Sequence, residues 1–124
     1  MTNVLIVEDN EMNRDMLTRR LERKGYTVSA AVDALSGVEM ARAQMPDIIL
    51  MDVALGAMDG WEATTILRRD EKTRDIPVIA LTAHALETDR RKSIEVGCVD
   101  FETKPVSLAD LIAKIEKHAN RTRA

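Results

Sequence analysis

Four short apolar runs of this chain are each followed by polar residues that could handle a phosphoryl group. The runs and their polar residues are 4–7 with Glu8 and Asp9, 48–51 with Asp52, 78–81 with Thr82, and 98–101 with Lys104 shortly after it. If the runs are parallel strands of an open α/β sheet, their carboxyl ends share one edge, where such sheets bind ligands. Three carboxylates, a hydroxyl and an ammonium would then converge at that edge.

Carboxylates gathered in this way need a counter-charge. Two of them about 4 Å apart repel each other by roughly 4 kcal/mol at an effective dielectric constant near 20. Hard oxygen ligands without a histidine or thiol nearby favour Mg²⁺, which also accepts phosphate oxygens. An aspartate beside such an ion can act as a nucleophile toward phosphorus and form an acyl phosphate. Each residue alone has an ordinary explanation, such as a helix cap or a turn acid, so the prediction rests on their shared place at strand ends.

Other site chemistries find little support in the sequence. Neither G-x-G-x-x-G nor G-x-x-x-x-G-K-[ST] occurs, so a nucleotide-binding loop is not expected. His84 and His118 lack metal-ligand spacing, and there is no G-x-S-x-G elbow. The single cysteine, Cys98, lies in an apolar segment, and we expect a small buried hydrophobe there rather than a disulfide.

The composition is that of one globular domain. The 124 residues are 45% hydrophobic and 31% charged, and the formal net charge of −3 argues against broad electrostatic binding to nucleic acid or membranes. No apolar run approaches the roughly 18 residues of a membrane helix, and the first residues do not resemble a signal peptide. We expect a single cytoplasmic domain over residues 1–124 without a DNA-binding domain, and we interpret basic clusters such as 90–92 as solvated helix faces.

Apolar runs alternate with helical periodicity along the chain, which predicts βα units and a parallel sheet. Strands are expected at 4–7, 26–31, 48–51, 78–81 and 98–101, each followed by a helix. The helix within 86–96 is more polar than the others and is expected to be poorly buried. The last helix is the clearest, because its apolar residues recur at i, i+3, i+4 and i+7 after Ser107. Right-handed crossovers then place helices on both faces of the sheet.

The ordered set of motifs resembles the receiver domain of two-component response regulators, from residue 4 to about residue 118. The matching pieces are VLIVEDN at 4–10, PDIILMDV at 46–53, MDG at 58–60, PVIALTA at 77–83, and Lys104-Pro105. The resemblance implies an α/β fold of the (βα)5 type, a doubly wound, flavodoxin-like parallel sheet with strand order 2-1-3-4-5.

The resemblance also implies a phosphoacceptor and a metal site. Asp52 would receive a phosphoryl group from a histidine of a sensor histidine kinase or a histidine phosphotransfer protein. Asp9, Asp52 and the backbone carbonyl of Ala54 would bind Mg²⁺ or Mn²⁺, with Glu8 acting through water. The chain would assist its own phosphorylation and dephosphorylation without being a turnover enzyme on foreign substrates.

Three more residues would sense the phosphoryl group and transmit its presence, and a proline follows one of them. Thr82 would bond a phosphoryl oxygen, Lys104 would pair with the phosphate, and Phe101 would follow Thr82. Pro105 matches the family's proline after the lysine, which is often preceded by a cis peptide bond. A downstream protein would then bind the face formed by the fourth helix, the fifth strand and the fifth helix. Whether phosphorylation also drives dimerisation is left open.

The chain departs from the family pattern at two positions. Gly56 stands where a proline is usual, which predicts a more mobile loop after Asp52. Glu8 replaces the commoner aspartate and keeps its charge with one more methylene, so metal binding should survive. Ala54 and His84 occupy positions where the family tunes loss of the phosphoryl group; the alternative for His84 is an incidental, exposed histidine.

The leading prediction is a stand-alone phosphoacceptor that signals through protein contacts. A receiver excised from a hybrid histidine kinase is the alternative, and the helical end without a linker favours the single-domain form. A metal-dependent phosphatase-like enzyme is disfavoured, because Ala54 stands where its acid–base aspartate would be. A degenerate receiver that binds a partner without phosphorylation is disfavoured by the intact set of Asp9, Asp52, Thr82 and Lys104.

Overall fold

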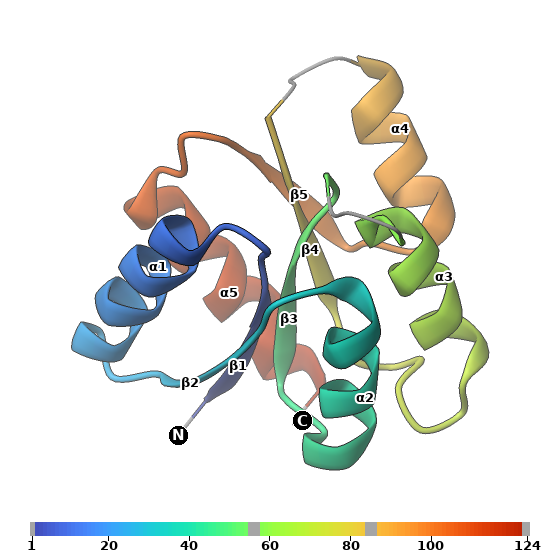
Figure 1. Cartoon of the computed structure of the whole chain (residues 1–124), viewed down its shortest axis with the longest axis horizontal. Helices are drawn as coiled ribbons and strands as arrows, with labels where there is room; N and C mark the ends of the chain where they lie inside the picture. The colour runs from blue at the N-terminus through green and yellow to red at the C-terminus, as the bar shows by residue number, and fades with distance from the viewer. Residues whose placement is uncertain (1, 55–57, 84–86, 123–124) are drawn as a thin grey trace.

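Five parallel strands form one sheet in the order β2-β1-β3-β4-β5 (Figure 1). The strands are β1 (Asn3–Val7), β2 (Thr27–Ala31), β3 (Ile48–Asp52), β4 (Val78–Thr82) and β5 (Asp100–Thr103). The computed structural model describes residues 2–54, 58–83 and 87–122. The predicted fold class and strand order are confirmed.

Helices cover both faces of the sheet, as Figure 1 shows. They are α1 (Glu11–Arg23), α2 (Ala34–Gln44), α3 (Gly60–Arg69), α4 (Glu87–Val96) and α5 (Leu108–Thr122). Four of them begin at a side-chain cap, in which Asn10, Asp33, Asp59 or Ser107 accepts a hydrogen bond from the backbone N–H three residues later. These caps fix where each helix leaves the edge of the sheet.

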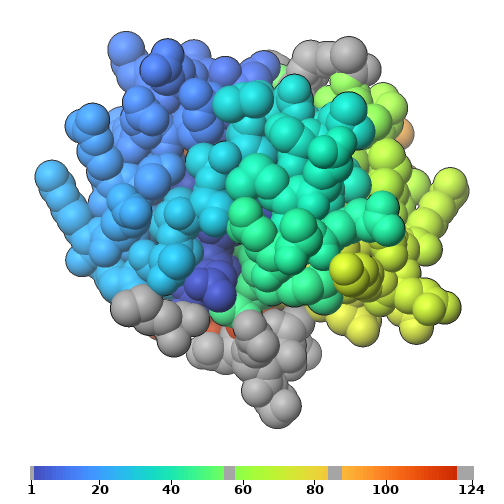
Figure 2. Space-filling model, turned by 60° about the horizontal axis from the view of Figure 1, so that its bottom comes forward, coloured from blue at the N-terminus to red at the C-terminus, as the bar shows by residue number. Residues whose placement is uncertain are grey.

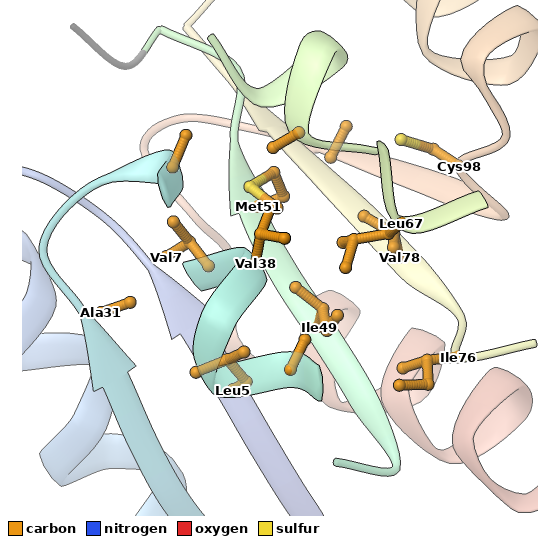
Figure 3. Packing of buried hydrophobic residues seen from close by; sticks show 14 of the residues in the cluster. Leu5, Val7, Ala31, Val38, Ile49, Met51, Leu67, Ile76, Val78 and Cys98 are labelled. Atoms are coloured by element: carbon orange, nitrogen blue, oxygen red, sulfur yellow. The ribbon is translucent and has the colours of Figure 1, made fainter. Parts of the chain in front are cut away.

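Alternate residues of the strands supply two separate cores. Leu5 and Val7 of β1 face α2 and α3 in the first core, while Val4 and Ile6 face α1 and α5 in the second. Figure 3 shows the first core, with Met51 of β3 among its members. Successive side chains of a strand point to opposite faces, so a sheet covered on both faces needs continuous apolar runs. That requirement explains why the first and third strands are easy to recognise in the sequence.

The second strand begins one residue later than predicted. The backbone N–H of Tyr26 donates to the carbonyl of Leu21, 3.3 Å away, and Gly25 has a φ of +97°. This left-handed turn ends α1. Tyr26 therefore belongs to the helix terminus, and the strand starts at Thr27.

The fifth strand is shifted toward the C-terminus of its apolar run, which corrects the prediction for this segment. Cys98 donates its backbone N–H to the carbonyl of Ser93 and so belongs to the turn after α4. The strand continues to Thr103, which pairs with Thr82 of β4. Lys104 therefore follows its strand directly, like the other site residues, and not after a stretch of loop.

Two further expectations concern the surface. None of the helices in the described part of the chain is long and apolar enough to cross a membrane. Figure 2 shows one side of the molecule, where residues of α1 (blue) and α2 (turquoise) both reach the surface. The predicted poorly buried helix is α4, in which Ser93 is the one buried side chain among residues 88–96.

Candidate functional site

The residues predicted to do chemistry gather at the carboxyl edge of the sheet. Glu8 follows β1 directly, Asp52 and Thr82 are the last residues of β3 and β4, and Lys104 follows β5. Because β1, β3, β4 and β5 are neighbours in the sheet, residues far apart in the sequence become adjacent. The convergence predicted from the apolar runs is present in the fold.

The connection between β1 and α1 holds Glu8 at this edge. The backbone N–H of Glu8 donates to the carbonyl of Ala31 over 3.1 Å, and the Arg14 guanidinium donates to the carbonyl of Glu8 over 3.0 Å. Asn10 caps α1 by accepting from the N–H of Asn13 over 2.9 Å. Arg14 was missed in the sequence, because nothing in its spacing shows that a helical arginine turns back onto the strand before it.

Asp52 is held from two sides. Its Oδ1 accepts from the backbone N–H of Ala54 over 2.9 Å, and its Oδ2 accepts from the Lys104 ammonium over 2.8 Å. The same ammonium reaches Oε1 of Glu8 over 3.3 Å. Glu8 and Asp52 are 2% and 3% exposed, so this ion pair is largely shielded from water.

The backbone around Asp52 has little space. A Cβ on Gly60, at the start of α3, would lie 2.3 Å from the Asp52 carbonyl oxygen and 2.8 Å from the Cα of Val53. Asp59 caps α3, and Gly60, which has no side chain, permits this close approach. The first turn of α3 thus packs directly on the residue that ends β3.

Burial and neighbouring charges shift the pKa values of Glu8 and Asp52 in opposite directions. Burial, together with the nearby Asp52 carboxylate, raises the pKa of Glu8 from 4.5 to about 7. Burial alone would raise the pKa of Asp52, but interactions with Glu8, Lys104 and the Ala54 N–H outweigh it and hold that pKa below its usual value. For Lys104, burial acts against the charged form, yet the neighbouring carboxylates raise its pKa. Below about pH 7 the proton of this pair therefore resides on Glu8 rather than on Asp52.

Three carboxylates at this edge fit a hard divalent cation. Oxygens of Glu8, Asp9 and Asp52 all lie within 4.8 Å of one another. Oε2 of Glu8 is buried and has no hydrogen-bond partner among the described residues. A buried carboxylate oxygen without a donor is costly, and a cation would satisfy it. The donor set of oxygens matches Mg²⁺ rather than a softer metal.

The remaining predicted residues that the structure describes lie on β4, on β5 or just after β5. Thr82 is buried at the end of β4, and the carbonyl of Thr82 accepts from the Lys104 N–H over 2.7 Å. The peptide bond between Lys104 and Pro105 is cis. Phe101 is half-buried on β5 and packs against the first core. His84 and Gly56 lie outside the described residues.

Comparison with known proteins places this architecture in a family. The sequence profile of the response regulator receiver domain matches residues 4–116. The chain belongs to the response regulator receiver domain family. A receiver domain of this kind is a phosphoacceptor signalling module of two-component and phosphorelay systems.

Relatives of two lengths resemble this receiver domain. The polar-differentiation response regulator DivK of Brucella ovis is 38% identical over 94% of this chain and 94% of its own length. The DNA-binding dual master transcriptional regulator RpaA of Synechocystis is 36% identical over 98% of this chain. The receiver spans only 51% of RpaA, about half of that protein.

Solved structures share both fold and sequence with this receiver domain. The receiver domain of the sensor histidine kinase PA1611 from Pseudomonas aeruginosa PAO1 has a TM-score of 0.89 and 36% identity, over 96% of this chain and 98% of that one. It was solved with a magnesium ion coordinated in the active site cleft. The receiver domain of Ssk1 from Saccharomyces cerevisiae was solved with the histidine phosphotransfer protein Ypd1. Its TM-score is 0.87 at 30% identity, over 95% of this chain and 88% of that one.

Proposed function

We propose that Asp52 is the phosphoacceptor of this receiver domain. The observation that carries the proposal is the contact between the Lys104 ammonium and the Asp52 carboxylate, beside a three-carboxylate cluster. Glu8, Asp9 and Asp52, with the backbone carbonyl of Ala54, are the candidate ligands of Mg²⁺. Mn²⁺ offers the same preference for oxygen and is an alternative.

The site is suited to transfer of a phosphoryl group from nitrogen to oxygen. An ionised Asp52 oxygen attacks the phosphorus of a phosphohistidine, and a bond forms between them as the phosphorus–nitrogen bond breaks. The electron pair stays with the imidazole, which takes a proton from solvent. A bound Mg²⁺ would neutralise charge on the phosphoryl oxygens. Such transfers depend mostly on positioning and charge neutralisation, and Lys104 contributes both.

The phosphoryl group then changes the charge that Lys104 meets. A carboxylate with one negative charge becomes an acyl phosphate with more negative charge and three acceptor oxygens. Lys104 would pair with these oxygens, and the Thr82 hydroxyl would donate to one of them. Phe101 would respond on β5, and the α4–β5–α5 face would carry the change to a downstream protein. Ala54 and His84 would tune how long the group persists.

The donor is proposed to be a sensor histidine kinase or a histidine phosphotransfer protein. The structure of the Ssk1 receiver domain with Ypd1 supports this, since a similar fold there meets a histidine phosphotransfer protein. The similarity to the response regulator DivK supports the proposal that this receiver acts as a stand-alone regulator, which would act in the cytoplasm. The similarity to the PA1611 receiver domain favours the alternative, a receiver that forms part of a hybrid kinase.

One experiment tests the phosphoacceptor directly. The protein is incubated with acetyl phosphate and Mg²⁺, and its intact mass is followed for the wild type, Asp52→Asn and the exposed control Asp15→Asn. A Mg²⁺-dependent, base-labile gain of one phosphate in the wild type and in Asp15→Asn, absent in Asp52→Asn, is expected. The same adduct on Asp52→Asn would reject the assignment. Sustained release of phosphate from added phosphomonoesters would instead favour the phosphatase-like alternative.

A further inference from the structure

The backbone of Phe101 is satisfied by side chains rather than by another strand. Within the described residues, β5 is an edge strand whose one partner is β4. The N–H of Phe101 donates to Oδ1 of Asp100 over 2.9 Å, and its carbonyl accepts from the Lys114 ammonium over 2.6 Å. The outer edge of β5 is therefore occupied at this residue by one acidic and one basic group.

Two cations also lie against the aromatic ring of Phe101. The guanidinium carbon of Arg90, on α4, is 5.4 Å from the ring centroid, and the Lys114 ammonium, on α5, is 5.6 Å from it. Both distances are within the roughly 6 Å over which a cation is attracted to a ring face. α4 and α5 cover opposite faces of the sheet, so the ring is contacted from both sides of its strand (Figure 1). We call Arg90 and Lys114 the Phe101 cation pair.

Lys114 is itself fixed to β5 by charge. Its ammonium lies 2.7 Å from Oε1 of the buried Glu102. One turn later on α5, His118 lies 3.0 Å from Oδ2 of Asp100. Residues four apart on a helix share one face, so this face of α5 contacts β5 at two residues, Glu102 and Asp100. Arg90 is different, because its side chain is exposed and, in the described part of the chain, makes no hydrogen bond or ion pair, while its guanidinium lies over the ring.

The same strand leads to the phosphorylation site. Lys104 stands three residues after Phe101, and its ammonium touches Asp52. A phosphoryl group on Asp52 that moves Lys104 would therefore also displace the end of β5. The Phe101 cation pair holds the same strand three residues earlier. In this arrangement the Lys104 ammonium pairs with the free carboxylate of Asp52 while both cations lie against the Phe101 ring.

We propose that Arg90 and Lys114 are positioning residues that hold Phe101 in its unphosphorylated arrangement and so oppose the response to phosphorylation. This rests on the proposed role of Asp52. Displacing the ring breaks both cation contacts, so the cation pair shifts the equilibrium toward the unphosphorylated arrangement. By linkage, removing one contact must tighten binding of a phosphoryl mimic at Asp52. The expected gain is about two- to five-fold for one exposed cation–ring contact.

The experiment uses the single phenylalanine of the chain. Labelling with para-fluorophenylalanine gives one fluorine resonance, which reports on the Phe101 ring alone. Spectra are recorded for the wild type, Arg90→Gln, Arg90→Lys and Lys92→Gln, before and during titration with beryllofluoride in saturating Mg²⁺. Lys92→Gln is the matched control, because it removes a cation of α4 that lies over Trp61, 5.7 Å from that ring.

Arg90→Gln should shift the fluorine resonance of the unmodified protein and bind beryllofluoride about two- to five-fold more tightly than the wild type. Arg90→Lys should lie closer to the wild type, and Lys92→Gln should match it. An Arg90→Gln protein with an unchanged resonance and unchanged or weaker binding would overturn the proposal. Absence of beryllofluoride binding in the wild type would instead reject the role of Asp52, and with it the switching effect. The resonance comparison would still decide whether Arg90 positions the ring.

Discussion

The ammonium of Lys104 lies 2.8 Å from the carboxylate of Asp52, although 52 residues separate them in the sequence. The two side chains meet because β3, β4 and β5 are neighbours whose carboxyl ends share one edge. With Glu8 also 3.3 Å from the ammonium, one cation serves two buried carboxylates. This arrangement makes the site sensitive to any change in its positive charge.

Replacing Lys104 with methionine should destabilise the metal-free protein. The change leaves Glu8 and Asp52 buried without their cation, and loss of a hydrogen bond to a charged group costs about 1.5–3 kcal/mol. Mg²⁺ should restore part of the loss, so the thermal midpoint of Lys104→Met should rise more on adding Mg²⁺ than that of the wild type. Differential scanning calorimetry with Lys72→Met, an exposed lysine, as the control decides this. Equal responses to Mg²⁺ in all three proteins would contradict it.

Replacing Glu8 with glutamine should preserve the stability of the metal-free protein and weaken its binding of Mg²⁺. The substitution removes one of two repelling buried carboxylates, so the metal-free protein should be at least as stable as the wild type near pH 8. The same change removes a charged oxygen ligand and should weaken Mg²⁺ binding by about ten-fold or more. Chemical unfolding and isothermal titration calorimetry measure the two effects. Retained Mg²⁺ affinity would show that Glu8 does not take part in metal binding.

A methyl group on Gly60 should damage the site more than the rest of the fold. The Cβ of Gly60→Ala would overlap the Asp52 carbonyl, so α3 must shift relative to β3, and we expect a cost of about 1–3 kcal/mol. Gly25→Ala is a useful control. Its Cβ meets nothing within 4 Å, but its φ of +97° strains a side chain, which costs about 1 kcal/mol far from the site. Only Gly60→Ala should also slow phosphorylation by acetyl phosphate at matched folded concentrations.

The buried thiol of Cys98 should lower the free energy of unfolding of the protein at alkaline pH. Burial raises the pKa of this thiol from 9.0 to about 11, since the Thr64 hydroxyl and the nearby Arg68 offset only part of the effect. The folded state therefore keeps the proton between pH 9 and pH 11 while the unfolded state loses it. The stability from this difference is complete below pH 9 and is lost as the pH rises through 11. Relative to Cys98→Ser, the wild type should lose about 1 kcal/mol of unfolding free energy between pH 8 and pH 10.

The first and third strands could be predicted from the sequence, and so could the residues that follow them. β1 and β3 are buried on both faces, which demands unbroken apolar runs, and Glu8 and Asp52 mark their ends. The end of β5 could not be predicted in the same way. Glu102 is polar yet buried, because Lys114 from α5 neutralises it. Lys114 lies twelve residues after Glu102 in the sequence, so the residues of the strand itself do not indicate that this ion pair forms.

Arg90 shows the same limit on the surface. The sequence around 90–92 favours a solvated helix face, and the exposure of Arg90 agrees with that. Its guanidinium nevertheless lies 5.4 Å from the Phe101 ring centroid, a contact that requires α4 and β5 to be placed side by side. Charge spacing along one helix carries no information about the neighbouring element.

The sequence by itself determined the alternating βα pattern and the set of polar residues at the strand ends, since burial on both faces and termination of a strand are local properties. Only the tertiary structure decided which charges meet. The contacts that matter at the site join separate elements. They are the pairing of Lys104 with both Asp52 and Glu8, the bond from Arg14 to the Glu8 carbonyl, and the two cations at the Phe101 ring. Such contacts depend on distances between packed helices and strands, and electrostatic and hydrogen-bond energies change steeply over those few ångströms.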